Sequence, residues 1–164
     1  MRPSRIPPGP NQESVWDYPR PAIAESVGAR LRIEFAGRTI ADTSAGVRTI
    51  ETSHPPTYYF PRSDVDTGVM RLSQHRSFCE WKGQAEYFDL VLGDRISQDA
   101  CWSYPSPSRS FASITGFIAF YPARVDACFV DDERARPQPG HFYGGWITDS
   151  VVGPFKGDPG TLHW

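Results

Sequence analysis

Short runs of alternating apolar and polar residues, separated by turn residues, dominate the chain. In residues 31–35, Leu, Ile and Phe alternate with Arg and Glu, as expected of a half-buried β-strand. Ala36-Gly37 predicts a tight turn, and residues 38–42 return as the second strand of a hairpin. The same criteria predict further strands at 47–52, 57–60, 69–72, 86–92, 95–102, 116–121 and 125–130.

Helical signals are confined to two polar segments, 61–66 and 106–113, each with room for one helical turn. The 164 residues include 14 Gly and 16 Pro, which favour turns, and 13% aromatic residues, which favour strands. Residues 116–121 are the most apolar run, so we expect a central strand there. We therefore predict a mainly β fold with a few short helical turns.

The length is typical of one domain, and composition divides it into four segments. Residues 1–12 contain four prolines and predict a flexible arm, and residues 13–130 form the domain. Residues 131–140 are charged and proline-rich, which is typical of a linker. Residues 141–164 carry many large aromatic and aliphatic side chains. We expect this tail to pack on the domain or on a second copy, as in a homodimer.

Charge argues against two classes of partner. The 17 Lys and Arg residues nearly balance 19 Asp and Glu residues, giving a net charge of −2. That balance does not fit a protein that binds nucleic acid or a membrane surface through a basic field. No apolar run approaches the roughly 18 residues of a spanning helix, and the first residues lack the apolar region of a secretory signal. We expect a cytoplasmic protein.

Cysteine and histidine spacing does not predict a metal site or a cofactor. The three cysteines, at positions 79, 101 and 128, are odd in number and include no C-x-x-C pair. The four histidines are scattered singly, whereas structural zinc sites use paired ligands. We therefore expect free thiols, buried or half-buried in a reducing compartment.

Three segments, 51–61, 79–83 and 101–105, combine aromatic residues with ionisable or polar ones. Rigid apolar walls with a few fixed polar groups are typical of a small-molecule pocket, although rings also cap the open corners of β-proteins. Together the segments favour a pocket in which aromatic rings stack an apolar or planar ligand, while His54 and Lys82 hold a polar or anionic group. The predicted lining residues are His54, Tyr58, Tyr59, Trp81, Lys82, Trp102 and Tyr104.

Three of the ionisable residues are candidates for catalysis, and each has a structural alternative. His54 fits a general base, or a side chain that holds the Pro-Pro turn after it. Lys82 fits a base or Schiff-base amine, or a lysine whose stem lies on Trp81. Cys79 fits a nucleophile or an inert core thiol. In an extended chain, Glu51 and His54 would point to opposite faces. An enzyme and an interaction module therefore remain alternatives to a binding protein.

Several motifs also resemble a known family, the bacterial and fungal domain of unknown function 427, sometimes labelled nucleotidyltransferase-like. They are ESVWDYPRP at 13–21, RTIADT at 38–43, ETSHPPTYYFP at 51–61, CEWKGQAEYFDL at 79–90, WSYP at 102–105, GFIAFYPARVDACF at 116–129 and YGGWITDSVVGPFKGDPGT at 143–161. Glu80 departs from this pattern, since a proline is expected in C-x-W-K-G.

The resemblance implies a β-tent fold, in which two small antiparallel sheets lean together. This fold is similar to that of Mss4-like and methionine-sulfoxide-reductase-B-like proteins. Many such proteins join the sheets with a zinc ion held by two C-x-x-C pairs. Because this chain has no such pair, we expect no zinc here, and we expect the core and the tail to hold the sheets together.

Overall fold

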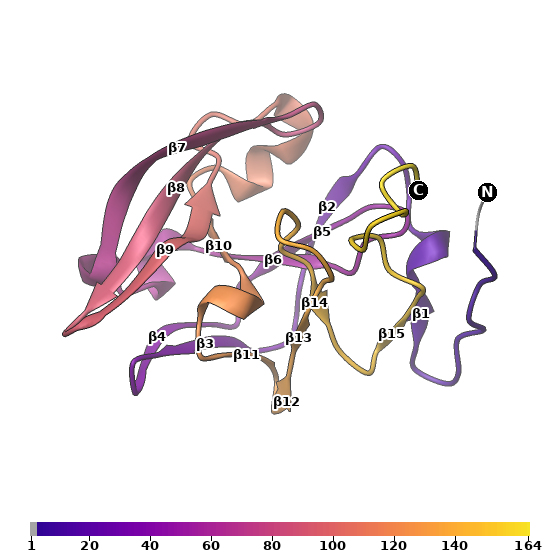
Figure 1. Ribbon diagram of the computed structural model, residues 1–164, viewed down its shortest axis with the longest axis horizontal. Helices are drawn as coiled ribbons and strands as arrows, with labels where there is room; N and C mark the ends of the chain where they lie inside the picture. Colours follow the sequence, from indigo (N-terminus) through magenta and orange to yellow (C-terminus); the bar gives the residue numbers. More distant parts are fainter. Residues whose placement is uncertain (1–2) are drawn as a thin grey trace.

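The structure, a computed structural model, describes residues 3–164, and a seven-stranded antiparallel sheet is its largest element (Figure 1). Its strand order is β2-β5-β6-β10-β9-β8-β7. In that order the strands span Ile23–Ser26, Val47–Ile50, Thr57–Phe60, Ile118–Phe120, Arg95–Ser103, Gly83–Leu92 and Met70–Cys79. The predicted apolar segment 116–121 is thus the central strand β10, as expected.

A second antiparallel sheet of four strands has the order β12-β11-β3-β4. These strands span Glu133–Arg134, Ala127–Val130, Leu31–Phe35 and Arg38–Thr43. Two small pairs complete the strands: β1 (Glu13–Ser14) runs parallel to β15 (Val151–Val152), and β13 (Arg136–Pro137) pairs with β14 (Trp146–Ile147). The 3₁₀ helices are η1 (Val15–Asp17), η2 (Arg62–Asp64), η3 (Thr67–Val69), η4 (Arg109–Ile114) and η5 (Pro122–Arg124).

These elements confirm the prediction of a mainly β protein with short helical turns. Neither main sheet closes on itself, and the arrangement of two open antiparallel sheets fits a β-tent. The hairpin of β3 and β4 has the predicted form. Residues alternate between buried and half-buried along β3, and Ala36 and Gly37 both adopt positive φ, at 51° and 78°, in the turn.

The strand β7 extends well beyond the predicted segment 69–72, and it lies at the edge of the sheet. Its residues 73–76 are Ser, Gln, His and Arg, and most of them are exposed, so no apolar alternation marks this part. Backbone pairing with β8 extends the strand to Cys79. At the other end of the sheet, β5 stops at Ile50 rather than 52, because residues 51–54 form a turn.

The main core lies between the two sheets. The four-stranded sheet contributes Leu31, Ile33 and Phe35, and the larger sheet contributes Phe60 and Phe120, all fully buried. Trp146 of β14 packs into the same cluster, and its indole N–H donates to the Phe120 carbonyl at 3.2 Å. The sheets are therefore joined by apolar packing to which the C-terminal segment contributes its largest side chain.

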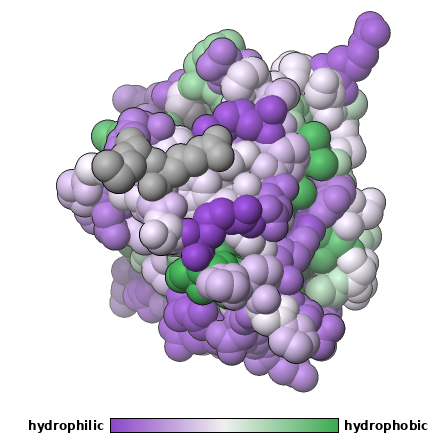
Figure 2. Space-filling view, turned by 90° about the vertical axis from the view of Figure 1, so that its right-hand side faces the viewer, coloured by the Kyte–Doolittle hydropathy of each residue, from purple (hydrophilic) through white to green (hydrophobic). Residues whose placement is uncertain are grey.

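The C-terminal segment lies against the rest of the same chain. Residues 131–140 include β12 and β13, which pair with other strands. Farther along the chain, the Pro154 carbonyl accepts from the Trp16 indole N–H at 2.9 Å. In the described part of the N-terminal segment, the Ile6 amide donates to the Gly153 carbonyl at 3.2 Å. Figure 2 shows a side of the molecule on which most residues are hydrophilic or intermediate and apolar ones form small separate groups. Within residues 3–164, no helix is long and apolar enough to cross a membrane.

Candidate functional site

A cavity of about 240 Å³ opens on the face of the seven-stranded sheet opposite the main core. Its walls come from three parts of the chain: the turn between β5 and β6, the tip of the β7–β8 hairpin, and the tail. Its ionisable lining residues, apart from the tyrosines, are Glu51, His54, Cys79, Glu80, Lys82 and Lys156. The aromatic ones are Tyr59, Phe78, Trp81, Tyr87, Trp102, Tyr104, Tyr121, Phe142 and Tyr143.

The floor of the pocket is a row of side chains across four neighbouring strands. Strand pairing places Tyr59 opposite Ala119, Ala119 opposite Trp102, and Trp102 opposite Tyr87. Residues paired in this way share one face of a sheet. Ala119 is small enough for the Tyr59 and Trp102 rings to approach edge to face, with 6.4 Å between centroids. The strand register thus gathers rings from distant parts of the sequence.

Six of the seven lining residues predicted from the sequence border this cavity, and Tyr58 does not. Tyr58 and Tyr59 are neighbours on β6, so their side chains point to opposite faces of the sheet. Tyr58 packs in the main core, where its ring lies 4.8 Å from the Trp146 ring. The prediction grouped both tyrosines because the segment 57–60 is apolar on both faces.

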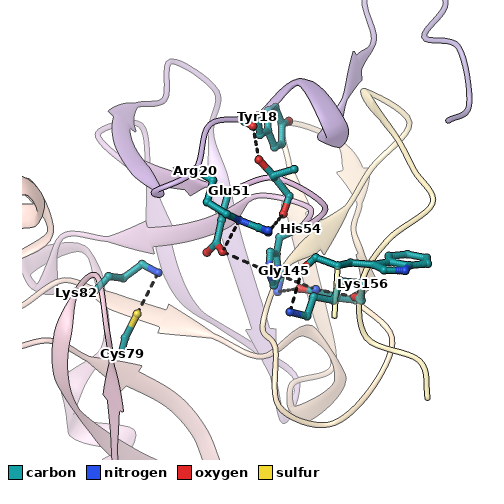
Figure 3. A network of polar contacts seen from close by, with 11 residues as sticks. Tyr18, Arg20, Glu51, His54, Cys79, Lys82, Gly145 and Lys156 are labelled. Atoms are coloured by element: carbon teal, nitrogen blue, oxygen red, sulfur yellow. Dashed lines mark hydrogen bonds and ion pairs between the residues drawn. The ribbon is translucent and has the colours of Figure 1, made fainter. Parts of the chain in front are cut away.

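A buried amide in residues 131–140, just before the tail, holds His54 in place. Gln138 Nε2 lies 3.1 Å from His54 Nδ1 and donates to the Lys156 carbonyl at 2.8 Å. Its other amide atom, Oε1, accepts from the Gly145 backbone N–H at 3.1 Å. The His54 ring also meets the Tyr143 ring edge to face at 4.8 Å. Figure 3 shows His54, Gly145 and Lys156 close together in this network, with its hydrogen bonds as dashed lines.

The environment of His54 disfavours its protonation. Burial is the main cause, and the nearby cations Lys156, Lys82 and Arg20 add to it, so the pKa of His54 falls to about 3. Since an effective general base has a pKa near the working pH, this value argues against that role at neutral pH. His54 is instead a neutral hydrogen-bonding group at the pocket wall.

Glu51 lies on the same side as His54, contrary to the expectation for an extended chain. Residues 51–54 turn, with the His54 amide donating to the Glu51 carbonyl at 3.1 Å and Ser53 at a φ of 74°. The turn brings Glu51 Oε2 within 3.8 Å of His54 Nε2. The same carboxylate lies 3.6 Å from Arg20 Nε. Reasoning from strand alternation missed Glu51 because the strand ends one residue before it.

Lys82 and Cys79 lie together at the tip of the β7–β8 hairpin. Lys82 Nζ is 3.9 Å from Cys79 Sγ and 5.6 Å from the centre of the Phe111 ring. Figure 3 shows the Lys82 side chain pointing from the hairpin toward Glu51. Cys79 is half-buried, whereas burial raises the pKa of the Cys101 and Cys128 thiols well above their usual range. Of the three, only Cys79 faces the pocket.

The tail adds a second lysine. Lys156 Nζ donates to the main-chain oxygen of Trp164 at 3.3 Å and lies 5.6 Å from the centre of the Tyr143 ring. Lys82 and Lys156 are the only lysines in the sequence, and both line this pocket. Neither has an Asp or Glu side-chain carboxylate within 4.0 Å in the part of the chain that the structure describes.

Two glycines let the tail approach the pocket this closely. A Cβ on Gly144 would stand 2.2 Å from the Trp102 ring, and one on Gly145 would stand 2.5 Å from Gln138 Oε1. Sequence reasoning missed the contribution of Gln138, Tyr143 and Lys156, and the adjacent glycines were the available signal. Among residues 3–164, no three His, Cys, Asp or Glu side chains gather as they would around a metal ion.

Comparisons with known proteins show which family the chain belongs to. No curated protein matches the chain. Residues 23–131 match the sequence model of a domain of unknown function, DUF427. The matched range contains His54 and Lys82, whereas Gln138, Tyr143 and Lys156 lie beyond it. Since the match spans more than half of its 164 residues, this chain belongs to the DUF427 family.

Proposed function

We propose that this chain binds a small planar molecule with a negatively charged group in the aromatic pocket. The observation that carries the proposal is the position of Lys82. Its amino group lies at the wall of a half-enclosed aromatic cavity, and no described carboxylate stands within ion-pair distance of it. A partly desolvated cation without a counter-ion favours an incoming anion.

The remaining walls support a planar ligand. Tyr59, Trp102 and Tyr104 offer ring faces and edges, and aromatic pairs gain about 0.5–1.5 kcal/mol beyond simple burial. The cavity volume of about 240 Å³ is below the roughly 300–1,000 Å³ of drug-sized ligand sites, which favours a compact molecule with one or two rings.

Titration with benzoate and its neutral analogue benzamide tests this proposal. We expect benzoate to bind the wild-type protein at least about tenfold more tightly than benzamide, because only benzoate offers a charge to Lys82. Lys82→Met should remove most of that difference while leaving the unfolding midpoint nearly unchanged. Isothermal titration calorimetry measures both affinities.

Arg109→Met supplies the matched control, because it removes one positive charge from an exposed residue of η4 that does not line the cavity. We expect it to bind benzoate like the wild type. Equal affinity of the wild type for benzoate and benzamide, or unchanged benzoate binding in Lys82→Met, would contradict the proposal.

A further inference from the structure

The hydrogen bonds of Gln138 settle which of its amide atoms faces His54. The Gly145 N–H can only donate, so its partner at 3.1 Å must be the amide oxygen of Gln138. The Lys156 carbonyl can only accept, so its partner at 2.8 Å must be the amide nitrogen. The atom that lies 3.1 Å from His54 Nδ1 is therefore an NH₂ group.

This orientation fixes the position of the proton on the imidazole. Because the Gln138 NH₂ group is a donor, His54 Nδ1 must accept, and it carries no proton. A neutral ring with an unprotonated Nδ1 has its proton on Nε2. Gln138 is itself buried, so water does not compete readily for these bonds.

The Nε2–H group has an open position on the pocket side. Its nearest carboxylate oxygen, on Glu51, is 3.8 Å away, which is too long for a hydrogen bond. The charged groups that act on the ring are Glu51, Lys156, Lys82 and Arg20, and the Tyr143 ring covers one side. Three cations thus face one carboxylate, and that carboxylate is already close to Arg20.

Besides burial, the three nearby cations disfavour a proton on His54, and these cations attract a negatively charged ligand atom. We propose that Gln138 is a positioning residue that holds His54 as a neutral donor, and that the Nε2–H group receives the anionic oxygen of the ligand. The ligand is then a planar ring that bears an oxyanion, either a carboxylate or a phosphate. The second half of this inference rests on the proposed function, whereas the state of His54 does not.

The state of His54 is tested without any ligand by ¹⁵N NMR of the imidazole nitrogens. We expect a protonated Nε2 and an unprotonated Nδ1 in the wild type, unchanged between pH 8 and pH 6. In Gln138→Glu, the carboxylate can only accept, so the proton should move to Nδ1 and His54 should titrate within this range. Gln74→Glu, an exposed residue outside the pocket, adds the same charge and should leave His54 unchanged.

A wild-type His54 with its proton on Nδ1, or one that becomes protonated between pH 8 and pH 6, overturns the inference. This wild-type measurement decides the point even where Gln138→Glu does not fold. Assignment of the His54 signals requires only their loss in a His54→Asn variant.

Benzoate and phenyl phosphate then test the role of the donor. We expect the bound oxyanion to shift the His54 Nε2 signal. The affinity of the wild type for benzoate, which stays ionised over this range, should be constant between pH 8 and pH 6. Gln138→Glu should bind benzoate about tenfold more weakly at pH 8 and recover as its His54 becomes protonated. The tighter of the two probes identifies the class of oxyanion.

The outcomes separate the two proposals. Binding of benzoate with no change at His54 Nε2, or a Gln138→Glu affinity that does not depend on pH, overturns the donor role and leaves the proposed function standing. Failure of both probes to bind overturns the proposed function, and the ¹⁵N spectrum still decides what Gln138 does.

Discussion

The two faces of the seven-stranded sheet both carry aromatic side chains, but one face packs into the main core and the other lines the pocket. On β6, Tyr58 and Phe60 point toward the four-stranded sheet and pack into the main core, while Tyr59 between them lies in the cluster that lines the pocket. The inner face is covered by a whole second sheet. The outer face is covered only in part, by η4, the hairpin tip and the tail.

This comparison shows that the covering layer, rather than the residue type, decides whether a ring fills a core or lines a cavity. The inner cluster consists mainly of aliphatic and Phe side chains. The pocket face instead carries Tyr hydroxyls, the two lysines and His54. Polar groups collect where the second layer leaves space, because a fully covered face would leave them without partners.

Phe→Ala substitutions on the two faces should differ most in how much they lower the free energy of unfolding. Phe120 is fully buried and its ring meets the Phe60 ring edge to face at 5.4 Å. Phe120→Ala should lower the free energy of unfolding by about 3–5 kcal/mol, through lost burial and a cavity. Urea unfolding followed by circular dichroism measures this loss.

Phe142→Ala is the matched change on the pocket side. Its side chain is 66% exposed. The hydrogen bond from the Tyr121 hydroxyl is accepted by the backbone carbonyl of Phe142, which the substitution leaves in place. We expect a loss below about 1 kcal/mol, since little burial is lost. Equal losses in the two variants would mean that both faces are packed alike, and the comparison would fail.

The pH dependence of stability tests how strongly the pocket side excludes a proton from one buried group, His54. His54 has a pKa near 3 in the folded protein and about 6.5 in the unfolded chain. Below pH 6.5 the unfolded chain therefore binds a proton that the folded protein excludes. The contribution of His54 is fully present above pH 6.5, and it falls by about 1.4 kcal/mol per pH unit toward pH 3.

His54→Asn isolates this effect from the carboxylates, which also titrate at low pH. The difference in slope between wild type and variant, measured by urea unfolding from pH 7 to pH 4.5, should equal the His54 contribution. Parallel slopes in the two proteins would show that the folded protein accepts a proton at His54 as readily as the unfolded chain does.

Much of the inner face was predictable from the sequence. The alternation of Leu31, Ile33 and Phe35 predicted β3, and the Ala36-Gly37 turn predicted the hairpin, because a half-buried sheet imposes a two-residue period. The same reasoning failed for residues 73–79 of β7. An edge strand has few buried side chains and depends on backbone pairing, which leaves no periodic signal.

The pocket lining was predictable only where its residues lie in aromatic motifs. Trp81, Lys82 and Trp102 were found because each stands in a dense local cluster of the sequence. Gln138 and Lys156 were not, since they belong to residues 132–164, which follow the matched domain and approach Trp102 closely at Gly144. Long-range contacts of this kind depend on the tertiary path of the chain, which no local pattern encodes.

Two pocket tyrosines should show the smallest difference in stability, because each substitution removes only one hydroxyl group. The Tyr121 hydroxyl donates to the Phe142 carbonyl at 3.1 Å, whereas the Tyr104 hydroxyl has no hydrogen bond to any described residue. Tyr121→Phe should therefore lower the free energy of unfolding by about 0.5–1.5 kcal/mol, and Tyr104→Phe should leave it nearly unchanged. Urea unfolding of both variants, made in parallel, measures the difference.

We expect the two substitutions to rank in the opposite order when benzoate affinity, rather than stability, is measured. Because the Tyr104 hydroxyl is free of bonds to the described protein groups and lines the cavity, its removal should affect benzoate affinity more than stability. Tyr121→Phe should affect stability more than affinity, since its hydroxyl is already engaged with the tail. A Tyr104→Phe variant that loses stability like Tyr121→Phe would show that this hydroxyl is bonded within the folded protein, and the outer face would then be closed like the inner one.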